Sequence, residues 1–207
     1  MSQLWRVAAI TTLCLVGAMT LSAQDQARAT ARQSGSSRLE MDLGFVLEQS
    51  EKTREVGMLQ ELRSGDRFHV RIRPKQPSYA YLFVARAGAF NLVLPGERSG
   101  SRTAQVARDQ WNTLPDQDWL RFDDKERGAE RMYLFVSTSP VDEIEELFEE
   151  GRKGDAVDET WLLDLRNKLD GEGTTTVTRA ADVVRVAHRR RGTGAAVVIE
   201  ELNVRHK

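Results

Sequence analysis

Two segments of the chain are apolar on both faces, and they constrain its folding more than any other feature. The first, SYAYLFVARA, covers residues 78–87, and the second, RMYLFVST, covers residues 131–138. Alternate side chains of an extended chain point to opposite sides, so both faces of each segment need cover. The pattern therefore predicts two central strands, each lying between two other layers of the protein.

Shorter segments with alternating or β-branched residues predict the strands that would accompany these two. They cover residues 39–47, 67–73, 90–94, 119–122, 174–177, 183–187 and 195–202. Residues 97–113 show no sustained period and are expected to form a long loop.

A helical period interrupts this series. Apolar residues at helical spacing predict one amphipathic helix over 141–150 and a second over 158–169. Many short strands with one such interruption predict a mainly β fold, a β-sandwich or open barrel of short antiparallel strands with a helical insertion near residues 140–170.

The N-terminus has the layout of a secretory signal, with one positive charge in residues 1–6, an apolar run over 7–21 and the small residues Ser22 and Ala23 at its end. The apolar run is shorter than the roughly 20 residues of a spanning helix, which favours a cleaved signal over the alternative of a retained anchor. Residues 24–37 contain no large apolar residue and are expected to form a flexible tether. We expect an exported protein, periplasmic or secreted, with a single β-rich domain over 38–207.

Charge and cysteine content exclude some classes of protein. The chain has 30 Lys and Arg against 31 Asp and Glu, a balance that gives no overall attraction to nucleic acid. Cys14, the single cysteine, lies in the expected signal. The exported chain would then fold without disulfides and without an integral membrane span.

Several segments, in this order, resemble the bacterial family called domain of unknown function 4384. They are RSGDRFHVRI (63–72), SYAYLFVARAGAFNLVLP (78–95), TLP (113–115), GAERMYLFVSTSP (128–140) and the pair Thr178-Arg179. The resemblance covers roughly residues 38–202. The chain departs from the family at Leu62, where an aromatic residue is common, and in its arginine run at 189–191.

The resemblance implies an exported or envelope-attached module whose partner is another envelope protein or polymer. The family has no established catalytic residues, so none is carried over to this chain. We expect no cofactor.

The segment LRSGDRFHV, residues 62–70, contains a polar turn followed by a strand. Gly65 is expected to allow a positive φ there, and Asp66 to accept hydrogen bonds from nearby backbone amides. The alternation places His69 in one row with the arginines of the strand. We interpret this row as the solvent-exposed face of a strand, with His69 as a surface residue.

Residues with catalytic or metal-binding chemistry are sparse. The three histidines, His69, His188 and His206, have no other ligand at metal-binding spacing on the same element. Carboxylates gather only near a turn, at Asp123, Asp124, Glu126 and Glu130. These could perform acid–base hydrolysis or keep a hairpin soluble, and we favour solubility. We assign no catalytic residue and no metal ligand.

Three other groups of residues could bind a partner. The acidic face of the first helix carries Glu143, Glu146 and Glu150, and the arginine run comprises Arg189, Arg190 and Arg191. A solvated helix face and a charged edge hairpin that prevents aggregation are the simpler interpretations. Tyr79, Tyr81 and Trp119 could line a groove, although core packing is the more economical role.

The sequence therefore favours an exported, non-catalytic binding or scaffolding module of the bacterial cell envelope. The alternative is a hydrolase of an envelope polymer that uses the carboxylates in 123–130.

Overall fold

The computed structural model describes residues 37–50, 52–57, 61–63, 65–86, 89–95, 104–116, 118–121, 128–149, 156–170, 173–180, 183–190 and 195–206. They belong to one compact unit, Gly35–Lys207. The expected signal and tether lie outside the described residues, except that Ser37 already forms the first residue of a strand.

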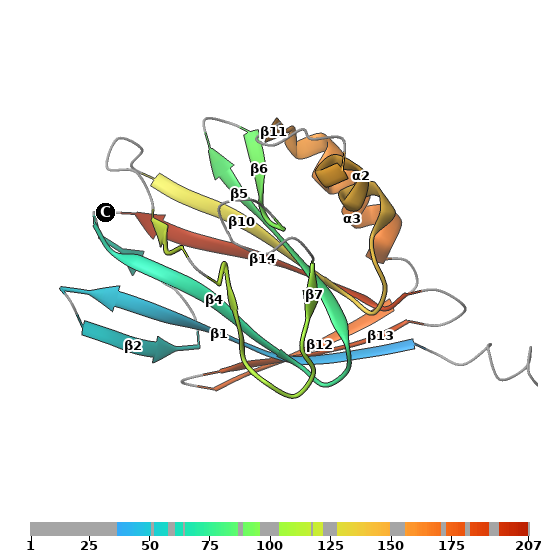
Figure 1. The fold of residues 1–207 in the computed structure, drawn as a ribbon, viewed down its shortest axis with the longest axis horizontal. Helices are drawn as coiled ribbons and strands as arrows, with labels where there is room; N and C mark the ends of the chain where they lie inside the picture. Colours follow the sequence, from blue (N-terminus) through green and yellow to red (C-terminus); the bar gives the residue numbers. More distant parts are fainter. Residues whose placement is uncertain are drawn as a thin grey trace, which may run out of the picture. The chain divides into compact units, whose positions relative to one another are not determined.

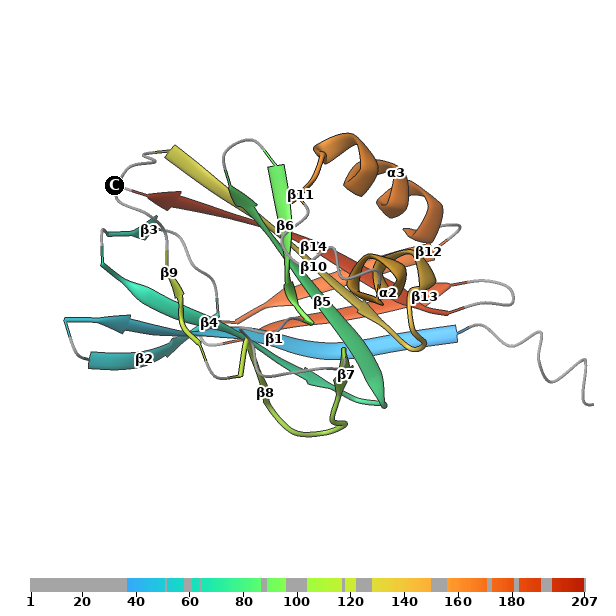
Figure 2. The same ribbon diagram turned by 45° about the horizontal axis from the view of Figure 1, so that its top comes forward.

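The described strands form two sheets, which we call A and B (Figures 1 and 2). Sheet A has the order β12 (Gly173–Arg179), β13 (Val184–Arg190), β1 (Ser37–Gln49), β4 (Arg67–Pro74) and β8 (Asn112–Leu114), with β2 (Lys52–Val56) on β1 and β9 (Leu120–Arg121) on β4. Sheet B has the order β11 (Ala156–Val157), β6 (Ala89–Leu94), β5 (Ser78–Arg86), β10 (Gly128–Ser137), β14 (Val197–His206) and β3 (Glu61–Leu62), with β7 (Gln105–Val106) on β5.

The first core lies between the two sheets. Alternate residues of β1, such as Leu39, Met41 and Leu43, pack there against Leu82 of β5 and Leu134 of β10. Leu82 and Leu134 are directly opposite each other on neighbouring strands, and both are fully buried. The apolar alternation of β1 thus places one row of its side chains in this core and the other row on the far side of sheet A.

The second core lies between sheet B and two helices, α2 (Asp142–Glu149) and α3 (Glu159–Asp170). Tyr81 and Phe83 of β5 contribute to it from the sheet, and Ile144 and Leu162 from the helices. The two strands that are apolar on both faces, β5 and β10, are therefore central in sheet B and covered on both sides, as predicted.

Side-chain hydrogen bonds hold the first turns of both helices. The Asp158 Oδ1 atom accepts a hydrogen bond of 2.7 Å from the Trp161 amide and caps α3. At the start of α2, the Tyr81 hydroxyl accepts a hydrogen bond of 3.0 Å from the Val141 amide and donates one of 2.6 Å to Glu145 Oε1. A side chain of sheet B thus holds the first turn of α2 in place.

The prediction of a mainly β fold with a helical insertion is confirmed, and of the two architectures considered the protein adopts the sandwich. The expected loop over 97–113 is partly wrong, because β7 and the start of β8 lie within it. Both are edge strands of three residues or fewer, too short to show a period in the sequence. Helices cover the outer side of sheet B, whereas no described helix covers the outer side of sheet A (Figures 1 and 2).

Candidate functional site

The uncovered side of sheet A, which faces away from sheet B, is the candidate site, and we call it the outer face. Strand pairing builds it from segments far apart in the chain. Asp42 of β1 pairs in register with Arg73 of β4 on one side and with Arg185 of β13 on the other. Because directly paired residues point to the same face, the carboxylate and the two guanidinium groups meet across three strands.

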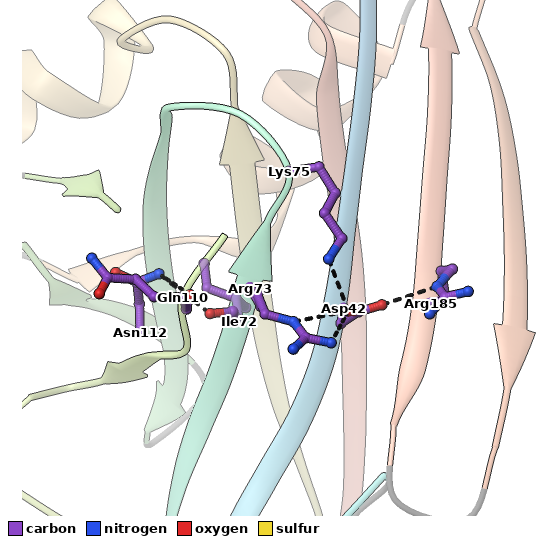
Figure 3. Close-up of polar contacts among 7 residues, drawn as sticks. All are labelled: Asp42, Ile72, Arg73, Lys75, Gln110, Asn112 and Arg185. Carbon is purple, nitrogen blue, oxygen red and sulfur yellow. Dashed lines mark hydrogen bonds and ion pairs between the residues drawn. The ribbon is translucent and has the colours of Figure 1, made fainter. Parts of the chain in front are cut away.

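The carboxylate of Asp42 is the centre of a cationic cluster, which we define as Asp42, Arg73, Lys75 and Arg185 (Figure 3). Asp42 Oδ2 accepts hydrogen bonds from Arg73 Nη2 at 2.6 Å and Nε at 3.1 Å. Its Oδ1 accepts one from Arg185 Nε at 3.0 Å, and Lys75 Nζ lies 3.5 Å from Oδ2. The carboxylate itself is buried, whereas the Arg185 side chain remains 66% exposed.

Electrostatics in the cluster favour the ionised carboxylate. Burial alone would raise the pKa of Asp42, but the hydrogen bonds from Arg73 and Arg185, together with Lys75, hold that pKa below its usual range. Three cations share this single carboxylate. Of the described carboxylates nearby, Glu40 pairs with Arg38, and Asp109 pairs with Arg108 while also lying within the electrostatic influence of Lys75 and Arg73. The cluster therefore carries an excess of positive charge at neutral pH.

Trp111 flanks this cluster on the β8 side. Its ring lies 4.7 Å from the guanidinium carbon of Arg71 and 5.0 Å from that of Arg73. The turn that presents Trp111 is held by Asn112, whose side chain bonds the Ala107 amide and carbonyl, both at 2.8 Å, and the Gln110 carbonyl at 2.9 Å. The side-chain Nδ2 of Asn112 also donates a hydrogen bond of 3.4 Å to the Ile72 carbonyl of β4, as Figure 3 shows.

His69 lies in the same row of β4, and our interpretation of it as a surface residue is wrong. Only 7% of His69 is exposed, because Trp119 packs over it with ring centroids 4.0 Å apart. The Arg67 guanidinium lies 5.8 Å from the same Trp119 ring. Burial lowers the pKa of His69 and outweighs the opposite effects of a hydrogen bond to the Pro115 carbonyl and of the Glu48 carboxylate. Among the described residues, no partner bonds His69 Nδ1.

The arginines of this row are not simply solvated either. Arg67 pairs with Glu48, and Arg71 pairs with Glu55 of β2 and packs against Trp111, so that only 16% of the Arg71 side chain is exposed. The expectation that this whole row is a wet strand face is therefore wrong for both His69 and Arg71.

The turn before β4 is structural. Gly65 has a φ of 89°, in the left-handed region that favours glycine. Asp66 Oδ2 accepts hydrogen bonds from the Arg63 amide at 2.8 Å and from Gln49 Nε2 at 2.6 Å. Asp66 thereby ties the turn to the end of β1.

Two acidic side chains of α2 are engaged by other parts of the protein. Glu143 pairs with Lys168 of α3, which lowers the pKa of Glu143, and Glu145 bonds Tyr81. Glu146 is exposed, and Glu150 lies outside the described residues. Of the three acidic residues considered for partner binding, the described structure leaves only Glu146 exposed to solvent.

The arginine run does not form a charged edge, which corrects our interpretation of it. Arg189 and Arg190 belong to β13, which is flanked on both sides by β1 and β12. Arg190 Nη1 donates a hydrogen bond of 3.0 Å to the Ala195 carbonyl. Arg191 lies outside the described residues. The sequence pattern could not show that a further strand, β12, follows β13 in the sheet.

The remaining candidates do not converge on a second site. Tyr81 is buried beneath α2 and belongs with Tyr79 to the second core, whereas Trp119 lies on the outer face of sheet A. The three residues therefore do not line a common groove. Asp123, Asp124 and Glu126 lie outside the described residues, as does the side chain of Glu130.

The described residues contain neither a metal-binding cluster nor a membrane-spanning helix. They contain no group of three or more His, Cys, Asp or Glu side chains placed to hold a metal ion. No helix in the described part of the chain is long and apolar enough to cross a membrane.

No family model, curated protein or solved structure matches the chain. The resemblance to domain of unknown function 4384 stays a prediction.

Sequence reasoning missed the two residues that organise the outer face, Asp42 and Trp111. The hydrogen-bond partners of Asp42 are 31 and 143 positions away in the chain, so only strand register brings them together. Trp111 stood in a segment expected to be a loop. The sequence does place Asp42 at a polar position of β1 and several arginines at polar positions of β4. Without the strand pairing, however, nothing in the sequence shows that these residues meet.

Proposed function

We propose that the chain is a non-catalytic binding or scaffolding module, exported to the bacterial cell envelope, and that the outer face of sheet A binds an anionic envelope partner. The observation that carries this proposal is the cationic cluster, where Arg73, Lys75 and Arg185 share the single carboxylate of Asp42. Asp42 neutralises only one of the three positive charges, and an anionic group of the partner would neutralise another.

The geometry of Arg185 supports this role. Arg185 bonds Asp42 through Nε, and among the described residues nothing engages its two terminal nitrogens. A guanidinium group held in this way is oriented by the protein and still presents donors to a carboxylate, sulfate or phosphate. Pre-orientation lowers the entropy that the side chain loses on binding.

Trp111 supports the same surface. Its indole stacks with Arg71 and Arg73, and stacking of this kind fixes arginine side chains that would otherwise sample many rotamers. The outer face thus combines fixed cations with a half-exposed aromatic ring. The envelope location is supported by the signal-like residues 1–23 and by the family resemblance.

Binding of the full chain to an immobilised acidic polysaccharide, with a neutral polysaccharide as reference, tests the surface. The double variant Arg185→Gln, Lys75→Gln removes two cations and leaves Arg73 on Asp42. We expect its affinity to fall about tenfold, which corresponds to about 1.4 kcal/mol. Binding of the unchanged chain should also weaken between low and physiological salt, as exposed charges become screened.

The matched control is the double variant Arg166→Gln, Lys168→Gln, which also removes two cations, both from α3, where they pair with Glu201 and Glu143 on the helical side. It should bind like the unchanged chain. Equal losses in both variants would mean that overall charge alone determines binding and would overturn the assignment of the surface.

Export is tested separately by mass spectrometry of the protein from its native cells, which should find Gln24 or a close neighbour at the N-terminus. An intact Met1 in a cytoplasmic fraction would contradict it.

A further inference from the structure

The edge strands of the two sheets differ in length and charge, and most of them are protected against pairing with another chain. Most edge strands in the described structure are very short, with two residues each in β3, β7, β9 and β11 and three in β8. The longer edge strand β2 reads KTREV and is strongly charged. Short and charged strands are the usual protection against edge-to-edge pairing, because an open edge presents unpaired backbone donors and acceptors.

Strand β12 lacks both protections. It spans seven residues, Gly173–Arg179, with the sequence GTTTVTR, and its five central residues are uncharged and β-branched. Its register with β13 runs without a bulge from Gly173 to Arg179. No described strand pairs with its other side, and its side chains are almost all exposed. A regular edge with an uncharged centre is a template for another strand.

We propose that β12 of one copy of the chain pairs antiparallel with β12 of a second copy, about a two-fold axis at Thr176. This register uses all seven residues of the strand. It places Thr176 opposite Thr176, Thr174 opposite Thr178, and Thr175 opposite Val177. Cross-strand pairs of β-branched residues stabilise a sheet, and paired threonines can also share hydrogen bonds.

The charge pattern of β12 selects this partner and this direction. In the antiparallel register Arg179 lies opposite Gly173, so that no like charges meet. A parallel, in-register pair would instead place Arg179 beside Arg179, which is repulsive. Half-buried Val177 at the margin of the first core would gain cover from Thr175 of the second copy. The interface is the same surface on both copies, as a two-fold dimer requires.

The dimer would join the two copies of sheet A into one continuous sheet. The outer faces of both copies would then lie on the same side of this sheet. Thr178 and Arg185 pair in register, so each cationic cluster lies close to the new interface. The two β13 strands would be three strand spacings apart, about 14 Å. A repeating anionic polymer could then contact both clusters at once, which raises avidity without a new contact. The pairing itself is independent of the proposed function.

Cysteine cross-linking of the full chain tests the pairing in a Cys14→Ser background, which leaves no native cysteine. Opposed residues of an antiparallel pair have Cα atoms about 4.5–5.5 Å apart, within the range that a disulfide spans. Thr176→Cys should therefore give a covalent dimer on mild oxidation. Thr53→Cys, at an equally exposed position of the charged edge strand β2, is the control and should stay largely monomeric.

The register has its own test. Thr174→Cys and Thr178→Cys chains should cross-link with each other when mixed, and much less when each is oxidised alone. In the unmodified chain, sedimentation should show a concentration-dependent dimer, and Thr176→Lys should raise its Kd at least tenfold, whereas Thr53→Lys should not.

Three results would overturn the proposal. The first is a chain that sediments as a monomer at every concentration. The second is a Thr176→Cys chain that cross-links no faster than Thr53→Cys. The third is a monomer in which the Thr176→Cys thiol resists a soluble thiol reagent, because that protection would mean that another segment of the same chain covers β12.

Discussion

Replacing Asp42 with Asn should destabilise the protein more than the loss of any other single charge on the outer face. The substitution keeps the shape of the side chain but removes the charge that holds Arg73 and Arg185. Each hydrogen bond between charged partners contributes about 1.5–3 kcal/mol. The amide oxygen of Asn retains part of one of these bonds, and Arg185, which is 66% exposed, can be rehydrated. We therefore expect a net loss of about 1–3 kcal/mol in the free energy of unfolding, which urea titration at pH 7 measures.

The pH dependence of this loss follows from the pKa of Asp42. Its pKa in the folded protein lies below the unfolded value of 3.8, so the ionised form stabilises the fold above that pH. The contribution is lost as the pH falls through the lowered folded pKa. The difference between the unchanged chain and Asp42→Asn should thus be largest near neutral pH and shrink in strong acid.

Asp109→Asn is the matched control for this prediction. Asp109 is also a carboxylate paired with an arginine, Arg108, but the pair is exposed, and Asn tolerates the positive φ of 58° at this position. The control should leave the midpoint of urea unfolding nearly unchanged, as substitutions at exposed sites usually do. If Asp42→Asn behaved like Asp109→Asn, the cluster would be an incidental surface pairing, and the argument for a pre-organised site would fail.

Three further predictions concern the core, the turn and His69. Leu82→Ala and Leu134→Ala should each cost about 2–5 kcal/mol in thermal or urea unfolding, and their effects should not add, because the two side chains are opposite each other; a cost below 1 kcal/mol for either would contradict a central position in sheet B. Gly65→Val should cost about 1–2 kcal/mol through its positive φ, although a Cβ at this position would meet no atom within 4 Å; an unchanged midpoint would refute that reasoning. Since burial lowers the pKa of His69, the free energy of unfolding should fall as the pH drops below about 6.5, and His69→Phe should flatten this part of the profile, which urea titrations from pH 7 to 5 would reveal.

Local patterns were sufficient for the central strands and the helices. In β5 and β10, apolar residues on both faces allow no solvent-exposed position, and helical periodicity predicts α2 and α3. These patterns depend on residues close together in the sequence, although the first turn of α2 is also held by Tyr81 from sheet B. The same kind of pattern therefore predicted the sandwich and the place of its helical insertion.

Patterns failed where a distant segment decides what covers a face. Alternation correctly placed His69 on the side of β4 opposite the core, but it could not show that Trp119, fifty positions later, would pack over that side. In the same way, it could not show that β12 would follow β13 and remove Arg189 and Arg190 from the edge. Strand order and register decide these cases, and neither is encoded within a single strand.

Tertiary contacts also explain why the helical side, with its long acidic run, is the weaker candidate for binding. The Tyr81 hydroxyl bonds both Glu145 and the Val141 amide, so one acidic side chain serves to fasten α2 to sheet B. Glu143 is neutralised by Lys168 from the neighbouring helix. On the outer face of sheet A the balance is reversed, because one carboxylate serves three cations. The run of acidic residues in the sequence thus overstates how much of α2 is free to bind a partner. Arg73, Lys75 and Arg185 are scattered in the sequence, but strand pairing brings them together on one carboxylate, and their excess positive charge is available to an anionic partner.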